Sequence, residues 1–132
     1  MALYTTKFTI PANTSEDNPV QTSLTIKEKL ITKMEISFPP GCSHMVGIQI
    51  KYGIKRIWPE NEGEYIYGDD ETISWEEHQE LPEKETQLTI IGVSPGTLYD
   101  HTVLIRIMTL PTAIESVNTL LQKIYDFFRR IF

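Results

Sequence analysis

The sequence predicts an all-β fold, an antiparallel β-sandwich of jelly-roll type followed by one C-terminal amphipathic α-helix. Short segments rich in Val, Ile, Thr and aromatic residues alternate apolar and polar side chains, and Gly, Pro and Asn separate them. After Pro111 the apolar period changes from two to about 3.5 residues. A chain of 132 residues with 40% hydrophobic residues can bury one core without disulfides or metals. We expect a sandwich domain over residues 1–111 and the helix over 112–132.

The first half of the chain contains the clearest strands. Leu3–Ile10 ends at Pro11 and a polar loop, and Val20–Ile26 forms the second strand. In Leu30–Phe38 the even-numbered residues are mostly apolar, which predicts that they face the core. The same alternation places Ile31, with Lys33, Glu35 and Ser37, on the opposite, solvated face.

The second half repeats the pattern, with a long acidic loop region after residue 58. Further strands are expected at Val46–Tyr52, Ile54–Trp58, Thr72–Glu77, Thr86–Val93 and His101–Met108. The inward positions of these strands should form one shared core: Met34, Ile36, Ile48, Ile50, Trp75, Leu88, Ile90, Val103 and Ile105. An immunoglobulin-like sandwich is the alternative, although the single cysteine, Cys42, cannot supply the paired cysteines of a true immunoglobulin domain.

The C-terminal segment has the spacing of an associating helix. Thr112 and Glu115 form a capping-box pattern. Apolar residues at alternating intervals of three and four make a heptad seam: Ile114, Val117, Leu121, Ile124, Phe128 and Ile131. Leu120, Tyr125, Phe127 and Phe132 widen the stripe. We expect the seam to bind other copies, with a trimer favoured; folding back onto the sandwich is the alternative.

Charge is distributed unevenly along the chain. The net charge is −6, which argues against general affinity for nucleic-acid phosphates. Residues 1–59 contain seven basic and four acidic residues, residues 60–111 contain two basic and twelve acidic ones, and the last segment is slightly basic. Two interpretations stay open, a solvated acidic face or complementary charge between neighbouring copies.

Candidate reactive residues lack the spacing that chemistry needs. His44, His78 and His101 lie on separate elements, and Cys42 follows a turn without any nucleophile signature. Asp69-Asp70-Glu71 resembles a calcium-binding turn only in composition. Trp58 and Trp75, with Tyr65 and Tyr67, could line a sugar platform, and the alternative for the two tryptophans is packing in the core. We expect no catalytic residues, no cofactor and no metal site, and therefore no enzymatic activity.

Four stretches resemble small β-sandwich structural proteins of tailed viruses that infect bacteria or archaea. They are Phe8-Thr-Ile-Pro-Ala-Asn-Thr, Ile36-Ser-Phe-Pro-Pro-Gly-Cys, Ile57-Trp-Pro-Glu-Asn-Glu-Gly-Glu and Gly68-Asp-Asp-Glu. The resemblance covers about residues 8–111 and rests on turn and strand features. It implies a head-decoration or similar accessory role in many copies on a symmetric shell, and it transfers no active site.

These features together predict a structural virion or assembly protein. The sandwich would decorate or cement a repeating protein shell, and the helix would bind other copies or other shell proteins. A carbohydrate- or calcium-dependent binding module is the alternative. A membrane surface is a further possible partner, because Lys123, Arg129 and Arg130 accompany the aromatic stripe. The first residues lack the pattern of a secretory signal, so we expect synthesis in the cytoplasm and, for a viral protein, a place in the virion.

Overall fold

A computed structural model describes residues 2–53, 56–61, 63–81, 85–111 and 113–131; side chains 56–57 and 113–120 lie outside this description. The chain forms strands and one C-terminal helix, α1, Ala113–Ile131. The strands are β1 Ala2–Ile10, β2 Val20–Ile26, β3 Leu30–Phe38, β4 Val46–Tyr52, β5 Arg56–Trp58, β6 Ile66–Gly68, β7 Glu71–Glu80, β8 Thr86–Val93 and β9 His101–Leu110.

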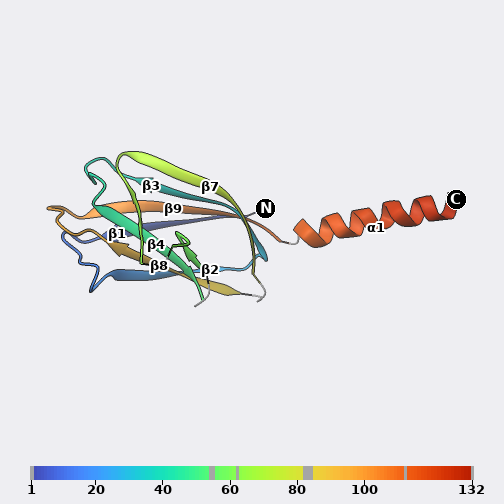
Figure 1. Cartoon of the computed structure of the whole chain (residues 1–132), viewed down its shortest axis with the longest axis horizontal. Coiled ribbons are helices and arrows are strands. Elements are labelled where there is room, and N and C mark those ends of the chain that lie inside the picture. The colour runs from blue at the N-terminus through green and yellow to red at the C-terminus, as the bar shows by residue number, and fades with distance from the viewer. Residues whose placement is uncertain (1, 54–55, 62, 82–84, 112, 132) are drawn as a thin grey trace.

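The strands form two antiparallel sheets packed face to face (Figure 1). One sheet has the order β1-β9-β3-β7, and the other has the order β2-β8-β4-β5, with β6 also paired to β4. Consecutive strands from β1 to β4, and from β7 to β9, therefore lie in opposite sheets. This is the strand order of a jelly roll, which confirms the predicted class. The immunoglobulin-like alternative is wrong, because that fold keeps its first two strands in one sheet.

The predicted core is confirmed. Met34, Ile36, Ile48, Ile50, Leu88, Ile90, Val103 and Ile105 are fully buried in one cluster, and Trp75 packs half-buried against it. Gly92 shows how closely the two sheets approach, since a Cβ atom there would lie 2.7 Å from Cδ1 of Ile10 and 2.8 Å from the Phe8 ring. The alternation that marks the inward face of each strand therefore locates the core correctly.

The prediction for Ile31 is wrong. A β-bulge lies between Ile31 and Lys33, where the register with β9 shifts from Ile31–Thr109 to Lys33–Met108. The extra residue, Thr32, donates its hydroxyl hydrogen to the carbonyl of Met108 at 3.2 Å. Because a bulge inserts one residue into the pleat, the phase before it is reversed. Ile31 is consequently fully buried and Lys33 is not.

Two elements differ from the sequence expectation in extent. β6 lies within the region that composition predicts to be an acidic loop, and it pairs with β4 from Val46–Gly68 to Ile48–Ile66. β7 continues to Glu80, three residues beyond the predicted end, because it stays paired with β3 as far as Leu30. The strand predicted at Ile54–Trp58 is described only from Arg56, and Ile54 lies outside the described residues.

Polar side chains tie the two sheets together at their margins. The Tyr4 hydroxyl of β1 donates to the Glu28 carboxylate and accepts the Lys27 amide at 3.1 Å, which anchors the β2–β3 turn. The hydrogen bond from Tyr4 is the main reason that the pKa of Glu28 is lowered. Trp58 of the other sheet is buried and donates its indole N–H to Glu77 of β7 at 3.0 Å.

The connections divide the sandwich into two different ends. Loops 11–19, 39–45, 69–70 and 94–100 all lie at one end, here called the loop end, as the register of the flanking strands requires. β9 begins at this end and leads to α1 at the opposite end (Figure 1). The loop end and α1 are therefore separated by the length of the sandwich.

Candidate functional site

The helix α1 presents an uncovered apolar seam. It projects away from the sandwich and does not fold back onto it (Figure 1). Four of the predicted seam residues have described side chains, and all are exposed: Leu121 58%, Ile124 45%, Phe128 53% and Ile131 57%. The side chains of Ile114 and Val117 lie outside the described residues. The helical spacing brings the four described residues onto one face, where no part of the described sandwich covers them.

Further apolar side chains widen this seam. Tyr125 and Phe127 are about 60% exposed, and the Phe127 and Phe128 rings meet edge to face with centroids 5.8 Å apart. The opposite face is polar, where Gln122 donates to Asp126 at 3.1 Å. Arg129 and Arg130 lie exposed in the last turn, where positive charge is favourable beside the helix C-terminus. None of the described helical residues belongs to a helix long and apolar enough to span a membrane.

A second exposed apolar group, at the loop end, was missed by the sequence prediction. Leu98 is 82% exposed and Tyr99 is 73% exposed, and they are neighbours in the β8–β9 loop. Met45 of the β3–β4 loop is also partly exposed, and its sulfur would lie 3.6 Å from a Cβ atom on Gly96. Only the Ser-Pro-Gly turn before Leu98 marks this loop in the sequence, and it predicts a turn but not its exposure.

Hydrogen bonds fix the loop that holds Leu98 and Tyr99. Ser94 exchanges bonds with the β1–β2 loop: its amide donates to the Thr14 carbonyl at 2.8 Å, and its hydroxyl donates to the Pro11 carbonyl at 2.6 Å. The Ser94 hydroxyl oxygen also accepts the Thr14 amide at 3.0 Å. Three further bonds join the same two loops. They run from Ala12 N to Asp100 Oδ1 at 2.8 Å, from Asn13 N to Thr97 Oγ1 at 3.0 Å and from Gly96 N to Asn13 Oδ1 at 2.9 Å.

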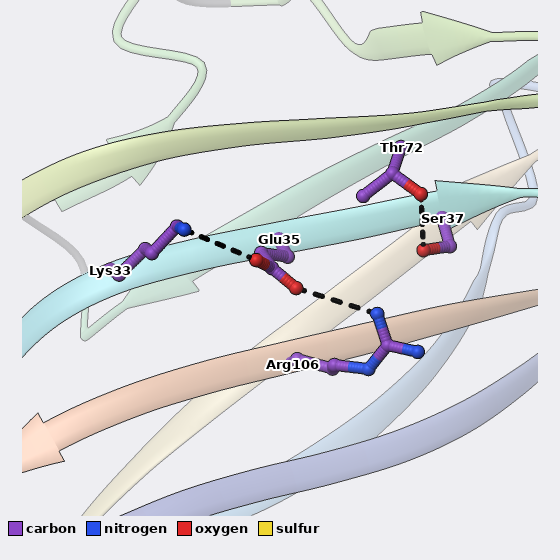
Figure 2. Close-up of polar contacts among 5 residues, drawn as sticks. All are labelled: Lys33, Glu35, Ser37, Thr72 and Arg106. Atoms are coloured by element: carbon purple, nitrogen blue, oxygen red, sulfur yellow. Dashed lines mark hydrogen bonds and ion pairs between the residues drawn. The ribbon is translucent and has the colours of Figure 1, made fainter.

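The centre of the outer face of the β1-β9-β3-β7 sheet carries polar side chains that pair with one another. Figure 2 shows Glu35 between two cations, with Lys33 Nζ at 3.4 Å and Arg106 Nη1 at 3.4 Å. Ser37 and Thr72 share a hydrogen bond of 2.9 Å across β3 and β7 (Figure 2). Partly exposed pairs of this kind contribute at most about 1 kcal/mol each. They leave the centre of this face balanced in charge.

The aromatic residues do not form a joint sugar platform. Trp58 is buried, so its ring face cannot stack on a ligand. Tyr65 and Tyr67 are half-buried and meet edge to face at 6.3 Å, and the Tyr67 hydroxyl donates to Glu16 at 3.2 Å. Burial, followed by the nearby Glu16 carboxylate, raises the pKa of both tyrosines.

The acidic turn after β6 is held by local bonds. The Asp69 amide donates to Glu71 Oε1 at 3.4 Å, and His44 Nε2 lies 3.7 Å from the same carboxylate oxygen. Asp70 adopts a positive φ of 47°, as expected in a tight turn. Within the described parts of the chain, no group of three or more His, Cys, Asp or Glu residues could hold a metal ion.

Cys42 lies in an environment that favours the neutral thiol. It is fully buried, and burial, with the nearby Asp69 charge, raises its pKa. A reactive cysteine requires the opposite shift, because the thiolate is the nucleophile. His101 is also buried, with its Nε2 3.8 Å from where a Cβ atom on Gly41 would lie. The two residues thus behave as core side chains under the β3–β4 turn.

Comparison with known proteins identifies no relative. No protein-family model matches the sequence, and no curated protein matches it. Three solved structures share a distant likeness over 82–83% of this chain. A mitogen derived from Yersinia pseudotuberculosis has a TM-score of 0.40 at 7% identity over 86% of its chain. A family two carbohydrate esterase from Cellvibrio japonicus has a TM-score of 0.43 at 13% identity over 36% of its chain. The VP2 subviral particle of infectious bursal disease virus has a TM-score of 0.37 at 13% identity over 32% of its chain.

Proposed function

We propose that this chain is a structural assembly protein whose sandwich decorates or cements a repeating protein shell, such as a virion, and whose copies associate through α1. The observation that carries the proposal is the exposed seam of α1, which projects from a sandwich that has its own complete core. Contiguous exposed apolar surface of this kind on a folded protein marks an interaction site. The role requires neither catalysis nor a cofactor.

The free energy available from the seam is sufficient for association. Full burial of a Leu, Ile or Phe side chain stabilises by about 1.5–3 kcal/mol relative to full exposure. The four described seam residues are about half exposed, so covering them contributes roughly 1 kcal/mol each, or about 4 kcal/mol per chain. Tyr125 and Phe127 lie beside the seam and add to this total. Leaving the seam in water forgoes that stabilisation.

The residue types of the seam favour a bundle of three or more helices. Ile114, Leu121 and Phe128 occupy one heptad position, and Val117, Ile124 and Ile131 occupy the other. Parallel dimers prefer Leu at the second position, whereas this seam has β-branched residues there. The flanking positions hold aromatic and aliphatic side chains where a dimer usually has charges. We therefore propose a trimer.

Native mass measurement of two seam variants tests the proposal. Leu121→Ser combined with Ile124→Ser should reduce the trimer to monomers while the far-ultraviolet circular dichroism keeps its β-sheet signal. Gln122→Ser combined with Lys123→Ser changes the polar face of the same turn and serves as the matched control. Truncation after Pro111 should give the same monomer. A full-length chain that is already monomeric, or equal masses for all variants, would remove α1 from the assembly.

The alternative module that binds carbohydrate or calcium makes a different prediction. It would use the acidic turn with the half-buried Tyr65 and Tyr67, and its binding would not depend on the seam. Glycan-array binding, or a rise in melting temperature with calcium, that persists after truncation of α1 would favour this alternative. Flotation of the full-length chain with anionic vesicles, lost on truncation, would identify a membrane surface as the partner of α1.

A further inference from the structure

The loop end is acidic, and His44 is the one residue in its four loops with a basic side chain. Loops 11–19, 39–45, 69–70 and 94–100 carry five carboxylates, Glu16, Asp17, Asp69, Asp70 and Asp100, and no Lys or Arg. Leu98 and Tyr99 stand exposed among them. Two loop ends of this composition would repel each other, so a partner must offer positive charge beside an apolar surface.

The loop end is also ordered in advance. Six hydrogen bonds of 2.6–3.0 Å join the β1–β2 loop to the β8–β9 loop, and Thr97 donates to the Ser94 carbonyl at 2.9 Å within the second loop. A loop held by such bonds loses little conformational entropy when its tip is covered. An exposed Leu and Tyr on a rigid support are well suited to serve as anchors in a protein interface.

The last turn of α1 has the complementary composition. Phe127, Phe128 and Ile131 are exposed there, together with Arg129 and Arg130. We call this group the helix tip. At the centre of the outer sheet face, by contrast, Lys33 and Arg106 are already paired with Glu35. Among the described residues, exposed cations adjoin exposed aromatic side chains at the helix tip. Tyr99 of the loop end can accept an arginine on its ring face in a cation–π contact.

We propose that the loop end of one copy binds the helix tip of a second copy, an inference that rests on the assembly function proposed above. The two surfaces lie at opposite ends of the molecule, so they cannot meet within one chain (Figure 1). A contact between two different surfaces of identical chains is heterologous, and it closes into a ring or continues from copy to copy as an open filament. When α1 forms a bundle, Phe128 and Ile131 are covered as members of the heptad seam, whereas Arg129 and Arg130 lie outside it and stay accessible, with Phe127 at the edge of the seam beside them.

Light scattering of the full-length chain in low and high salt provides the test. At about 20 mM salt the mass should exceed that of the bundle and rise with protein concentration, and at about 500 mM salt it should fall to the bundle mass, because salt screens the charge pairs. Leu98→Ser combined with Tyr99→Ser should abolish the larger species in low salt. Leu3→Ser removes an exposed apolar residue from β1, outside the loop end, and is the matched control.

Charge reversal identifies the second surface. Changing Ser15, Glu16, Asp17 and Asn18 together to Lys takes the charge of the four loops from −5 to +1 and should prevent the larger species, as should Arg129→Glu with Arg130→Glu. An equimolar mixture of the two variants should regain it, because each then offers the charge that the other lacks. Failure of the loop variants to change the mass, or failure of the mixture to recover it, would overturn the proposal. The outcome is separable from that of the seam experiment. If a loop variant stays a trimer, the bundle is intact and only the head-to-tail contact is lost. If a seam variant still forms larger species in low salt, the head-to-tail contact persists without the bundle.

Discussion

Replacing Ile31 with Ala tests the bulge in β3 against simple strand alternation. Alternation places Ile31 and Lys33 on one solvated face, so it predicts two nearly neutral substitutions. The structure separates them, because Ile31 is fully buried whereas Lys33 is partly exposed and paired with Glu35. We therefore expect Ile31→Ala to be strongly destabilising and Lys33→Ala to be nearly neutral.

The magnitudes follow from burial. Truncation of a fully buried Ile to Ala lowers the free energy of unfolding by about 2–5 kcal/mol, from lost apolar burial and the cavity left behind. For a domain of this size that corresponds to a fall in melting temperature of roughly 8–20 °C. Loss of the Lys33–Glu35 pair should cost less than about 1 kcal/mol, because Lys33 is 39% exposed.

Urea unfolding followed by tryptophan fluorescence measures both effects, since Trp58 is buried and Trp75 half-buried. Each variant should be measured at several protein concentrations, because association of α1 would make the midpoint depend on concentration. The denaturant midpoint should fall for Ile31→Ala with an unchanged slope. Equal, small effects for the two variants would show that β3 runs without a bulge and that Ile31 faces solvent.

Four further predictions concern the core, the margin of the sheets and metal binding. Ile36→Asp should unfold the sandwich, whereas Ser37→Asp on the opposite face should leave its circular dichroism unchanged. Gly92→Ala should lower stability by about 1–3 kcal/mol in chemical denaturation, because a Cβ atom would press on the facing sheet. Tyr4→Phe should cost about 1 kcal/mol at neutral pH. Because the pKa of Glu28 is lowered in the folded state, this contribution is present above its unfolded pKa and is lost as the pH falls through the folded pKa, so the difference in stability between wild type and variant should narrow in acid. EDTA should leave the melting temperature unchanged, and a fall that calcium reverses would assign a metal site to the acidic turn.

Alternation predicts most strands because one face of each is buried. Leu88 and Ile90 in β8, and Val103 and Ile105 in β9, occupy the phases expected of them. Alternation does not predict β6, because this strand is only three residues long and is defined by its backbone hydrogen bonds to β4. The bulge is equally invisible, since nothing around Thr32 marks an inserted residue.

Of the two candidate surfaces, the seam of α1 could be predicted from the sequence and the apolar pair at the loop end could not. The seam of α1 follows from spacing alone, because helical geometry places residues three and four apart on one face. Leu98 and Tyr99 carry no such pattern, and their exposure depends on bonds between two loops more than eighty residues apart in sequence, such as Ala12 to Asp100. Long-range pairing of that kind is a property of the jelly-roll topology and has no local signature.

β9 runs from the loop end along the whole length of the sandwich to the end from which α1 follows. It is an inner strand, hydrogen-bonded to β1 from Thr109 back to His101 and to β3 along most of its length. A pull on α1 against the loop end would therefore act along the strand axis and load these two rows of hydrogen bonds in shear, all at once. Many bonds would then have to break together, so the sandwich would resist this tension strongly. A strand peeled from a sheet edge, by contrast, loses one hydrogen bond at a time.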